Sequence, residues 1–85
     1  MDEKLLRFFK LIGYNDAISF ENASLKDMII NRKEHTLVLR INSPEIININ
    51  SMINLKNLCK DGVDDVKKIS IQMFYENLDS ELVLE

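Results

Sequence analysis

Residues 27–42 read DMIINRKEHTLVLRIN, with an apolar run on each side of the polar segment 32–35. In the second run, apolar and polar residues alternate, which is typical of a strand with one buried face. A polar segment of this length fits the turn between two antiparallel strands. The stretch therefore predicts a hairpin whose strands span residues 25–31 and 36–41.

A second alternating stretch lies further along the chain, at residues 66–75. Its apolar side chains fall at every second position, so it predicts a third strand. The strand at 36–41 ends before Pro44, which has no N–H group to donate to a neighbouring strand. If the second and third strands are parallel neighbours, topology rules favour a right-handed crossover between them. The sequence leaves open whether the third strand pairs with the first or with the second.

Two amphipathic helices are predicted, one on each side of the hairpin. The first spans residues 5–12 and ends at Gly13, a residue suited to a left-handed stop. The second begins near residue 49, with Asn48 or Asn50 as its cap, and ends at residues 61–62. The predicted apolar positions are Leu5, Phe8, Phe9 and Ile12 in the first helix and Ile49, Met52, Ile53, Leu55 and Leu58 in the second.

Residues 14–22 have no clear period and are read as a connection, anchored by Ile18 and Phe20, that contains a short helical turn. The order helix, strand, strand, helix, strand predicts an α+β fold. We expect a three-stranded sheet with both helices on one face. Residues 1–75 form one domain in this interpretation, and residues 76–85 are a tail or the start of a linker.

The composition favours a soluble, folded protein. Of the 85 residues, 46% are hydrophobic and 29% are charged, which is too apolar for disorder and too charged for a membrane protein. No apolar run approaches the roughly 20 residues that cross a bilayer. The formal net charge of −3 argues against general affinity for nucleic acid. The single cysteine and the acidic start of the chain, which does not resemble a signal peptide, favour the cytoplasm.

The sequence predicts no catalytic, metal-binding or cofactor-binding residue. His35, the only histidine, lies in a predicted turn and is read as a solvated side chain rather than a metal ligand. Cys59 is read as a core residue. As a nucleophile it would need a base, for which His35 is the only candidate of that type. Residues 60–65, KDGVDD, lack the ligand alternation of a calcium loop, and two glycines cannot form a phosphate-binding loop.

The face of the predicted sheet that is turned away from the helices is the candidate functional site. The residues expected to face both helices are Leu37, Leu39, Ile41, Ile69, Ile71 and Met73. Alternation then sends their neighbours to the opposite side. That side is more apolar than solvation requires, so we interpret it as a docking surface. Two other readings remain: residues 78–84 fold back over it, or it is ordinary surface. The candidate docking residues are Leu25, Ile29, Val38, Arg40, Lys68 and Phe74.

Three stretches carry a resemblance to a known family: LLRFFKLIGYND, LKDMIINRKEHTLVLRINSPEI and INSMINLKNLCKDGVDDVKKISIQMFY. Together they resemble the extreme N-terminal domain of the PolC-type DNA polymerase III alpha subunit, the replicative polymerase of low-GC Gram-positive bacteria. The shared features are a helix with a Leu/Phe stripe, a hairpin, a Pro-containing link, an amphipathic helix and a final strand.

The resemblance implies that the full-length protein is a DNA-directed DNA polymerase, a nucleotidyltransferase, with 3′–5′ exonuclease activity. The catalytic acids of that family lie in other domains, so this domain would be non-catalytic. The order of the elements also looks like a reduced KH-like fold without the Gly-x-x-Gly loop. The resemblance also implies docking to other domains of the polymerase or to replisome proteins, with the clamp-loader tau subunit as a partner. The alternative is a small KH-like module that binds single-stranded nucleic acid.

Overall fold

The computed structural model describes residues 1–76 and 81–84, and it confirms the predicted α+β order. The hairpin strands begin and end within two residues of the predicted positions, and the third strand begins two residues later than predicted. A short fourth strand, which the sequence analysis did not assign, follows. The elements are α1 (Glu3–Ile12), the 3-10 turn η1 (Ala17–Phe20), β1 (Ser24–Asn31), β2 (Thr36–Ser43), α2 (Ile49–Gly62), β3 (Lys68–Tyr75) and β4 (Glu81–Leu84).

The strands form one mixed sheet in the order β1-β2-β3-β4. β1 and β2 are antiparallel, as expected for strands joined by a tight turn. β2 and β3 are parallel, because α2 carries the chain back to the end of the sheet at which β2 began. β4 is antiparallel to β3. The third strand therefore pairs beside the second, which settles the alternative that the sequence left open.

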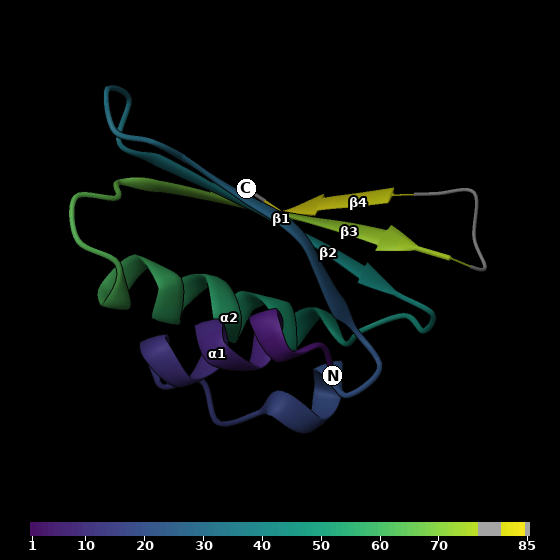
Figure 1. Cartoon of the computed structure of the whole chain (residues 1–85). Coiled ribbons are helices and arrows are strands. Elements are labelled where there is room, and N and C mark those ends of the chain that lie inside the picture. The colour runs from purple at the N-terminus through teal and green to yellow at the C-terminus, as the bar shows by residue number, and fades with distance from the viewer. Residues whose placement is uncertain (77–80, 85) are drawn as a thin grey trace.

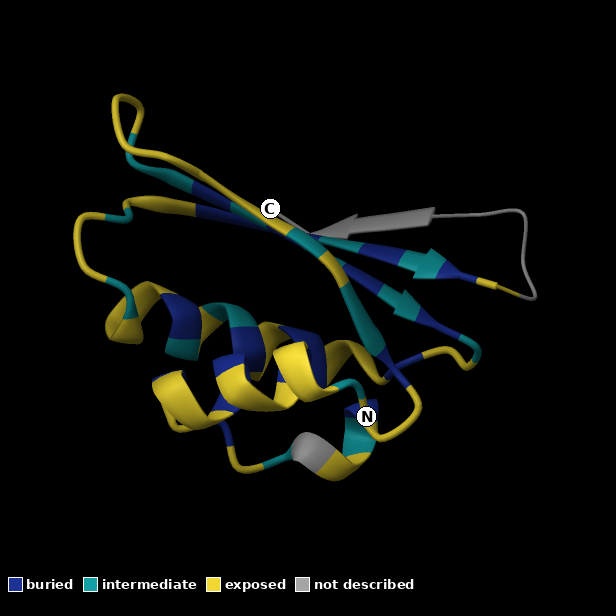
Figure 2. Ribbon diagram, viewed as in Figure 1, coloured by how far each residue is buried: buried dark blue, intermediate teal, exposed yellow. Residues whose placement is uncertain are grey.

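Both helices lie on the same side of the sheet, as Figure 1 shows, with α1 contacting β1 and α2 contacting β3. β2 and β3 are in parallel register, with Leu37 paired with Ile69, so their alternating side chains turn to the same faces. Figure 2 shows this alternation as dark blue bands along the two strands. The predicted inner-face residues are all at most 2% exposed: Leu37, Leu39, Ile41, Ile69, Ile71 and Met73.

An aromatic cluster joins α1 to the connection that follows it. The ring of Phe9 lies 4.8 Å from that of Tyr14 and 5.3 Å from that of Phe20, between centroids, in tilted and edge-on arrangements. Phe20 is 1% exposed and is the predicted anchor, but Ile18 is 74% exposed. The expectation for Ile18 was wrong because η1 is a single turn, which directs only one side of the segment to the core.

α2 is capped by Asn48, one of the two predicted candidates, whose Oδ1 accepts from the Asn50 N–H at 2.8 Å. Fewer of the predicted apolar positions of α2 are buried than expected, because Ile49 and Ile53 are 47% and 41% exposed. The helix contacts β3 above and α1 beside it, and these neighbours leave its remaining sides open. The buried residues of α2 are Ser51, Met52, Leu55 and Cys59.

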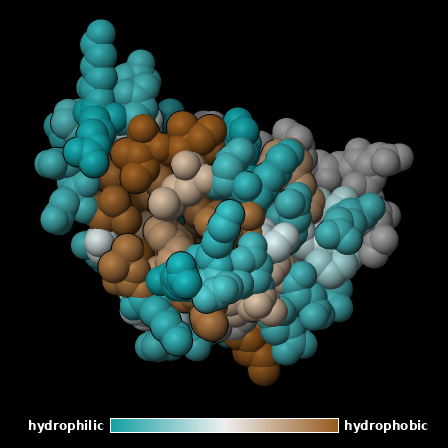
Figure 3. All heavy atoms as spheres, viewed as in Figure 1, coloured by the Kyte–Doolittle hydropathy of each residue, from teal (hydrophilic) through white to brown (hydrophobic). Residues whose placement is uncertain are grey.

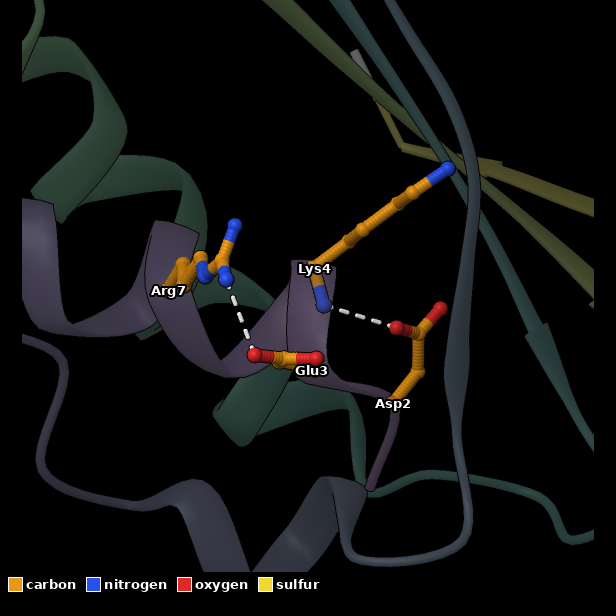
Figure 4. Close-up of polar contacts among 4 residues, drawn as sticks. All are labelled: Asp2, Glu3, Lys4 and Arg7. Atoms are coloured by element: carbon orange, nitrogen blue, oxygen red, sulfur yellow. Dashed lines mark hydrogen bonds and ion pairs between the residues drawn. The ribbon is translucent and has the colours of Figure 1, made fainter.

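Asp2 connects the start of α1 to the start of β1. Its Oδ1 accepts from the Lys4 N–H at 2.7 Å as the helix N-cap, as Figure 4 shows. Its Oδ2 accepts from the Leu25 N–H at 3.1 Å. The backbone N–H of Asp2 also donates to the Ala23 carbonyl at 3.2 Å. One carboxylate therefore holds the helix terminus against the edge strand.

We predict that Leu5→Ala lowers the free energy of unfolding by about 2–5 kcal/mol, because it opens a cavity at a fully buried position. Leu11→Ala is the matched control on the same helix. Leu11 is 78% exposed, so its loss should change stability by no more than about 0.5 kcal/mol. Urea unfolding followed by circular dichroism measures both. Equal effects at the two positions would contradict the packing of α1.

We also predict that Asp2→Ala destabilises the protein by about 1–2 kcal/mol, since both oxygens of its carboxylate accept backbone hydrogen bonds. Glu3→Ala is the control. It removes only the solvated 2.8 Å ion pair with Arg7 (Figure 4), which should contribute at most about 0.5 kcal/mol. Thermal unfolding compares the two variants. A larger loss for the Glu3 variant would show that Asp2 does not join the helix to β1.

Candidate functional site

The sheet face opposite the helices carries the side chains that alternate with the buried set, and we call it the open face. Neither helix covers it (Figure 1). The strand registers place on it residues from all three long strands. Its members on these strands are Ser24, Lys26, Asp27, Ile29 and Asn31 of β1, Thr36, Val38, Arg40 and Asn42 of β2, and Lys68, Ser70, Gln72 and Phe74 of β3.

A β-bulge in β1 changes which residues reach this face. Leu25 pairs with Ile41 and Asp27 pairs with Arg40, so Lys26 is an extra residue in the strand. Leu25 therefore shares the inner face with Ile41 and packs against the core. The prediction that Leu25 belongs to the docking surface was wrong, because strict alternation does not hold across the bulge. Ile29, which follows the bulge and pairs with Val38, does lie on the open face.

Arg40 links the three long strands across the open face. Its Nη1 lies 3.4 Å from Oδ2 of Asp27 on β1, and its Nε donates to Oε1 of Gln72 on β3 at 3.1 Å. The guanidinium and the carboxylate remain 34% and 43% exposed. An ion pair this exposed contributes little to the stability of the fold. Together with the Gln72 hydrogen bond, its main effect is to orient the Arg40 side chain across the three strands.

Lys26 is a functional candidate that the sequence analysis missed. Its ammonium Nζ lies 4.0 Å from the ring centroid of Phe74, a cation–π contact that joins β1 to β3 over the central strand. The consecutive charged residues Lys26 and Asp27 break the alternation between Leu25 and Met28. That break is the signal in the sequence from which the bulge could have been inferred.

A shallow hollow of about 190 Å³ lies on the open face beside these contacts. Thr36, Val38, Lys68 and Gln72 surround it, and Ser70 lies between them. Ser70 is 8% exposed, and its hydroxyl has no hydrogen-bond partner among the residues that the structure describes. The hollow is therefore a place where a surface that covers the sheet could supply a hydrogen-bonding group.

Five of the six predicted docking residues lie together on the open face: Ile29, Val38, Arg40, Lys68 and Phe74. Ile29 is 43% exposed, while Val38 and Phe74 are half-buried. On β1, β2 and β3, three cations and one carboxylate occupy this face, and the register of β4 places Glu81 on it opposite Phe74. The face thus combines exposed apolar area with a local excess of positive charge.

The final strand does not lie across the open face. β4 pairs with β3 at the far edge of the sheet, with Gln72 opposite Val83 and Phe74 opposite Glu81. The sheet is extended by one strand instead. The backbone of residues 81–84 therefore does not fold back over the open face, as one reading of the sequence had it. Residues 78–80, which that reading also included, lie outside the described residues. The assignment of 76–85 as a tail or linker stays a prediction.

His35 has a structural contact that the sequence analysis did not foresee. Its Nδ1 lies 3.0 Å from the Asp65 carbonyl oxygen, and only an N–H can bond there, so Nδ1 donates. Its own carbonyl accepts from the Lys67 and Lys68 N–H groups at 2.8 and 3.2 Å. His35 is half-buried rather than solvated, and it ties the hairpin turn to the loop before β3.

Cys59 is fully buried, as predicted for a core residue. Burial raises the pKa of its thiol to about 12, so the group is protonated near neutral pH and is a poor nucleophile. Among residues 1–76 and 81–84, no cluster of His, Cys, Asp and Glu side chains could hold a metal ion. In the same residues, no helix is long and apolar enough to cross a membrane.

Tyr14 is held by a polar cluster between η1 and α2. Its hydroxyl donates to the Ser51 carbonyl at 3.1 Å, and the Ser51 hydroxyl donates to Oδ2 of Asp16 at 2.8 Å. Burial, together with the nearby charge of Asp16, raises the pKa of Tyr14 to about 12. The polar groups of this cluster are hydrogen-bonded to one another, so the cluster positions η1 relative to α2.

Comparison with known proteins gives a family match. Residues 4–73 match the model of the family described as DNA polymerase III polC-type N-terminus I. This span includes everything from α1 to most of β3, and therefore nearly all of the open face. No curated protein and no solved structure matches the chain.

We predict that the stability of the protein falls as the pH rises above 9. The pKa of Cys59 is about 12 when folded and 9.0 when exposed, so unfolding releases a proton in this range. The stabilisation that comes from the raised pKa of Cys59 is fully present below pH 9. It is lost progressively toward pH 12, and the free energy of unfolding falls by up to about 1.4 kcal/mol per pH unit. Urea unfolding at pH 8, 9 and 10 measures it.

Cys59→Ala is the control for this prediction. It lowers stability at every pH, but it should remove the part of the pH dependence that begins at pH 9. Tyr14, whose pKa is raised from 10.0 to about 12, adds a further loss of stability only above pH 10. An unchanged slope between pH 9 and 10 in the Cys59 variant would contradict the protonated thiol.

Proposed function

Because this chain belongs to the family of DNA polymerase III polC-type N-terminus I domains, we propose that it is a docking domain of a replicative polymerase. Domains of this family are a non-catalytic part of a DNA polymerase. In our proposal the open face binds another part of the polymerase or another replisome protein. Polymerase and 3′–5′ exonuclease chemistry would belong to other domains of a full-length cytoplasmic protein.

The observation that carries the proposal is the composition of the uncovered sheet face. A sheet face left in water is normally polar, but this one carries Ile29 paired with Val38 on β1 and β2, and Phe74 near the end of β3, all partly exposed. Apolar side chains of this kind become fully buried when a protein surface covers them. The hollow beside the buried Ser70, and Arg40 with its hydrogen bond to Gln72, then supply polar contacts next to these apolar side chains.

The local excess of positive charge suggests the chemistry of the partner surface. Lys26, Arg40 and Lys68 lie among the apolar residues of β1, β2 and β3, where Asp27 is the acidic residue, and Glu81 of β4 lies opposite Phe74. An acidic partner surface would be attracted to such a patch and oriented by it. The tau subunit of the clamp loader is the replisome protein that we propose to test first.

Binding of single-stranded nucleic acid is the alternative function. Such modules stack bases on exposed aromatic rings of a sheet, and Phe74 is in a suitable position. The ammonium of Lys26 already lies over that ring at 4.0 Å, however, and a stacked base would have to displace it. The net charge of −3 and the presence of only two glycines also favour a protein partner.

We predict that Phe74→Ala and Val38→Asp each weaken binding of the tau subunit, or of the remaining polymerase chain, by at least about tenfold. Phe74→Ala removes apolar contact area, and Val38→Asp places a carboxylate opposite the apolar side chain of Ile29. Isothermal titration calorimetry measures the affinity, and thermal unfolding confirms that each variant is folded. Ile18→Asp, at an exposed position on η1, is the matched control and should bind like the unmodified chain.

Two results would contradict the proposal. If both variants are folded and bind both partners as tightly as the unmodified chain, the open face is not the docking surface. If the chain instead binds a labelled single-stranded oligonucleotide with sub-micromolar affinity at physiological salt, the nucleic-acid function is the better one. Weak binding that disappears as salt is added would reflect only lysine–phosphate attraction.

A further inference from the structure

We propose that two copies of this chain pair through the free edge of β1, antiparallel and with Ile29 of one copy opposite Ile29 of the other. This contact would extend the sheet across both copies. It uses the edge of the sheet and includes Ile29, which also lies on the open face, but Val38, Lys68 and Phe74 take no part in it, so it can be tested separately from the docking function.

The first observation is that half of this edge lacks protection. β1 lies at the end of the strand order, and among the described strands it pairs with β2 alone. After Leu25, whose N–H donates to Asp2, the other side of β1 presents backbone N–H and C=O groups that no described strand pairs. Proteins normally protect such an edge with lysine, proline or a bulge. The bulge at Lys26 protects the first half of β1 in this way. Residues 28–31 carry no charge, and Met28, Ile29 and Ile30 are 41%, 43% and 47% exposed.

The second observation is that this half of the strand is complementary to itself. With Ile29 opposite Ile29, antiparallel pairing places Met28 opposite Ile30, and both side chains lie on the helix-covered face because they pair with Leu39 and Leu37. Asp27 is then opposite Asn31, whose amide can donate to the carboxylate. The ammonium of Lys26 is held over Phe74 instead of projecting along the edge.

The third observation is a groove that would receive an added side chain. A hollow of about 290 Å³ lies beside the end of β1, where Ile30 and the half-buried Val63 and Val66 form its apolar part. Its other lining residues are polar: Asn31, Arg32, His35, Asp64 and Asp65. Met28 of a second copy would lie opposite Ile30 at this hollow, and methionine adapts readily to irregular apolar space. Figure 3 shows hydrophobic surface gathered at the hairpin end of this side of the molecule.

These observations favour a second copy over an unrelated strand. Every contact of the pairing is made twice by the two-fold symmetry, so both edges and both grooves are occupied by the same residues. A ladder of about five residues buries less area than a stable interface, which needs about 1,000 Å² in total. The dimer would therefore be weak, and covalent trapping is a suitable way to detect it.

The test is disulfide trapping of the Ile29→Cys variant at high protein concentration, with diamide as the oxidant. Directly opposed residues of antiparallel strands have Cα atoms about 4.5–5.5 Å apart, within the range that a disulfide spans. The two thiols lose two electrons and two protons to diamide, which is reduced to the hydrazine. We expect a covalent dimer on a non-reducing gel, formed at least about tenfold faster than by Met28→Cys, whose opposed residue is Ile30. The unmodified chain is the blank, because Cys59 is buried.

Sedimentation equilibrium supplies the second measurement and does not require a disulfide. Ile30→Lys places a charge opposite Met28 and should abolish the dimer, whereas Ile18→Lys adds the same charge at an exposed position and should not. Ile30 is not on the open face, so Ile30→Lys should bind the tau subunit normally. Circular dichroism confirms that the variants are folded.

The proposal is overturned if the unmodified chain remains monomeric at the highest concentration and Ile29→Cys cross-links no faster than Met28→Cys. It is also overturned if Met28→Cys cross-links faster, because the register would then be different. Dimerisation that survives Ile30→Lys would place the contact on another surface. Loss of tau binding in the open-face variants, with dimerisation unchanged, would separate the two proposals.

Discussion

The parallel pairing of β2 with β3 is the constraint on which the rest of the structure depends. Two parallel neighbours need a long crossover, and α2 provides it on one side of the sheet. Because the strands are in register, their alternating apolar residues form one continuous inner face. That face includes side chains that are completely buried, such as Leu39 and Ile71. The positions of α2, α1 and the aromatic cluster follow from the need to cover it.

A single covered face has a direct consequence for function. In so small a domain, both helices are used on one side, and the opposite side remains open between β1 and β3. Its side chains cannot be explained by burial within the domain. The cross-strand contacts of Arg40 and Lys26 hold this face in one arrangement before any partner arrives. A surface fixed in advance loses less conformational entropy on binding than a mobile one does.

The bulge in β1 shows how one extra residue changes a surface. By adding Lys26, it turns Leu25 to the core and brings a lysine beside Phe74 on the open face. It also divides the edge strand into a protected half and an unprotected half. The carboxylate of Asp2 binds the backbone of Leu25 just before the bulge, so this irregular segment is fixed by a hydrogen bond from outside the sheet.

The sequence by itself determined the element types, their order and most of the core, because helical and strand periodicities are local properties of the chain. Gly13, Asn48 and the stripe of α1 could be recognised for the same reason. The pattern also identified five of the six candidate residues of the open face. The tertiary structure alone decided the strand order, since neither neighbour of β3 is favoured by local periodicity. It also decided the placement of Leu25 and Ile18, the contact of His35 with Asp65 and the addition of β4. These features depend on hydrogen bonds and packing between segments far apart in the chain, which no local pattern records.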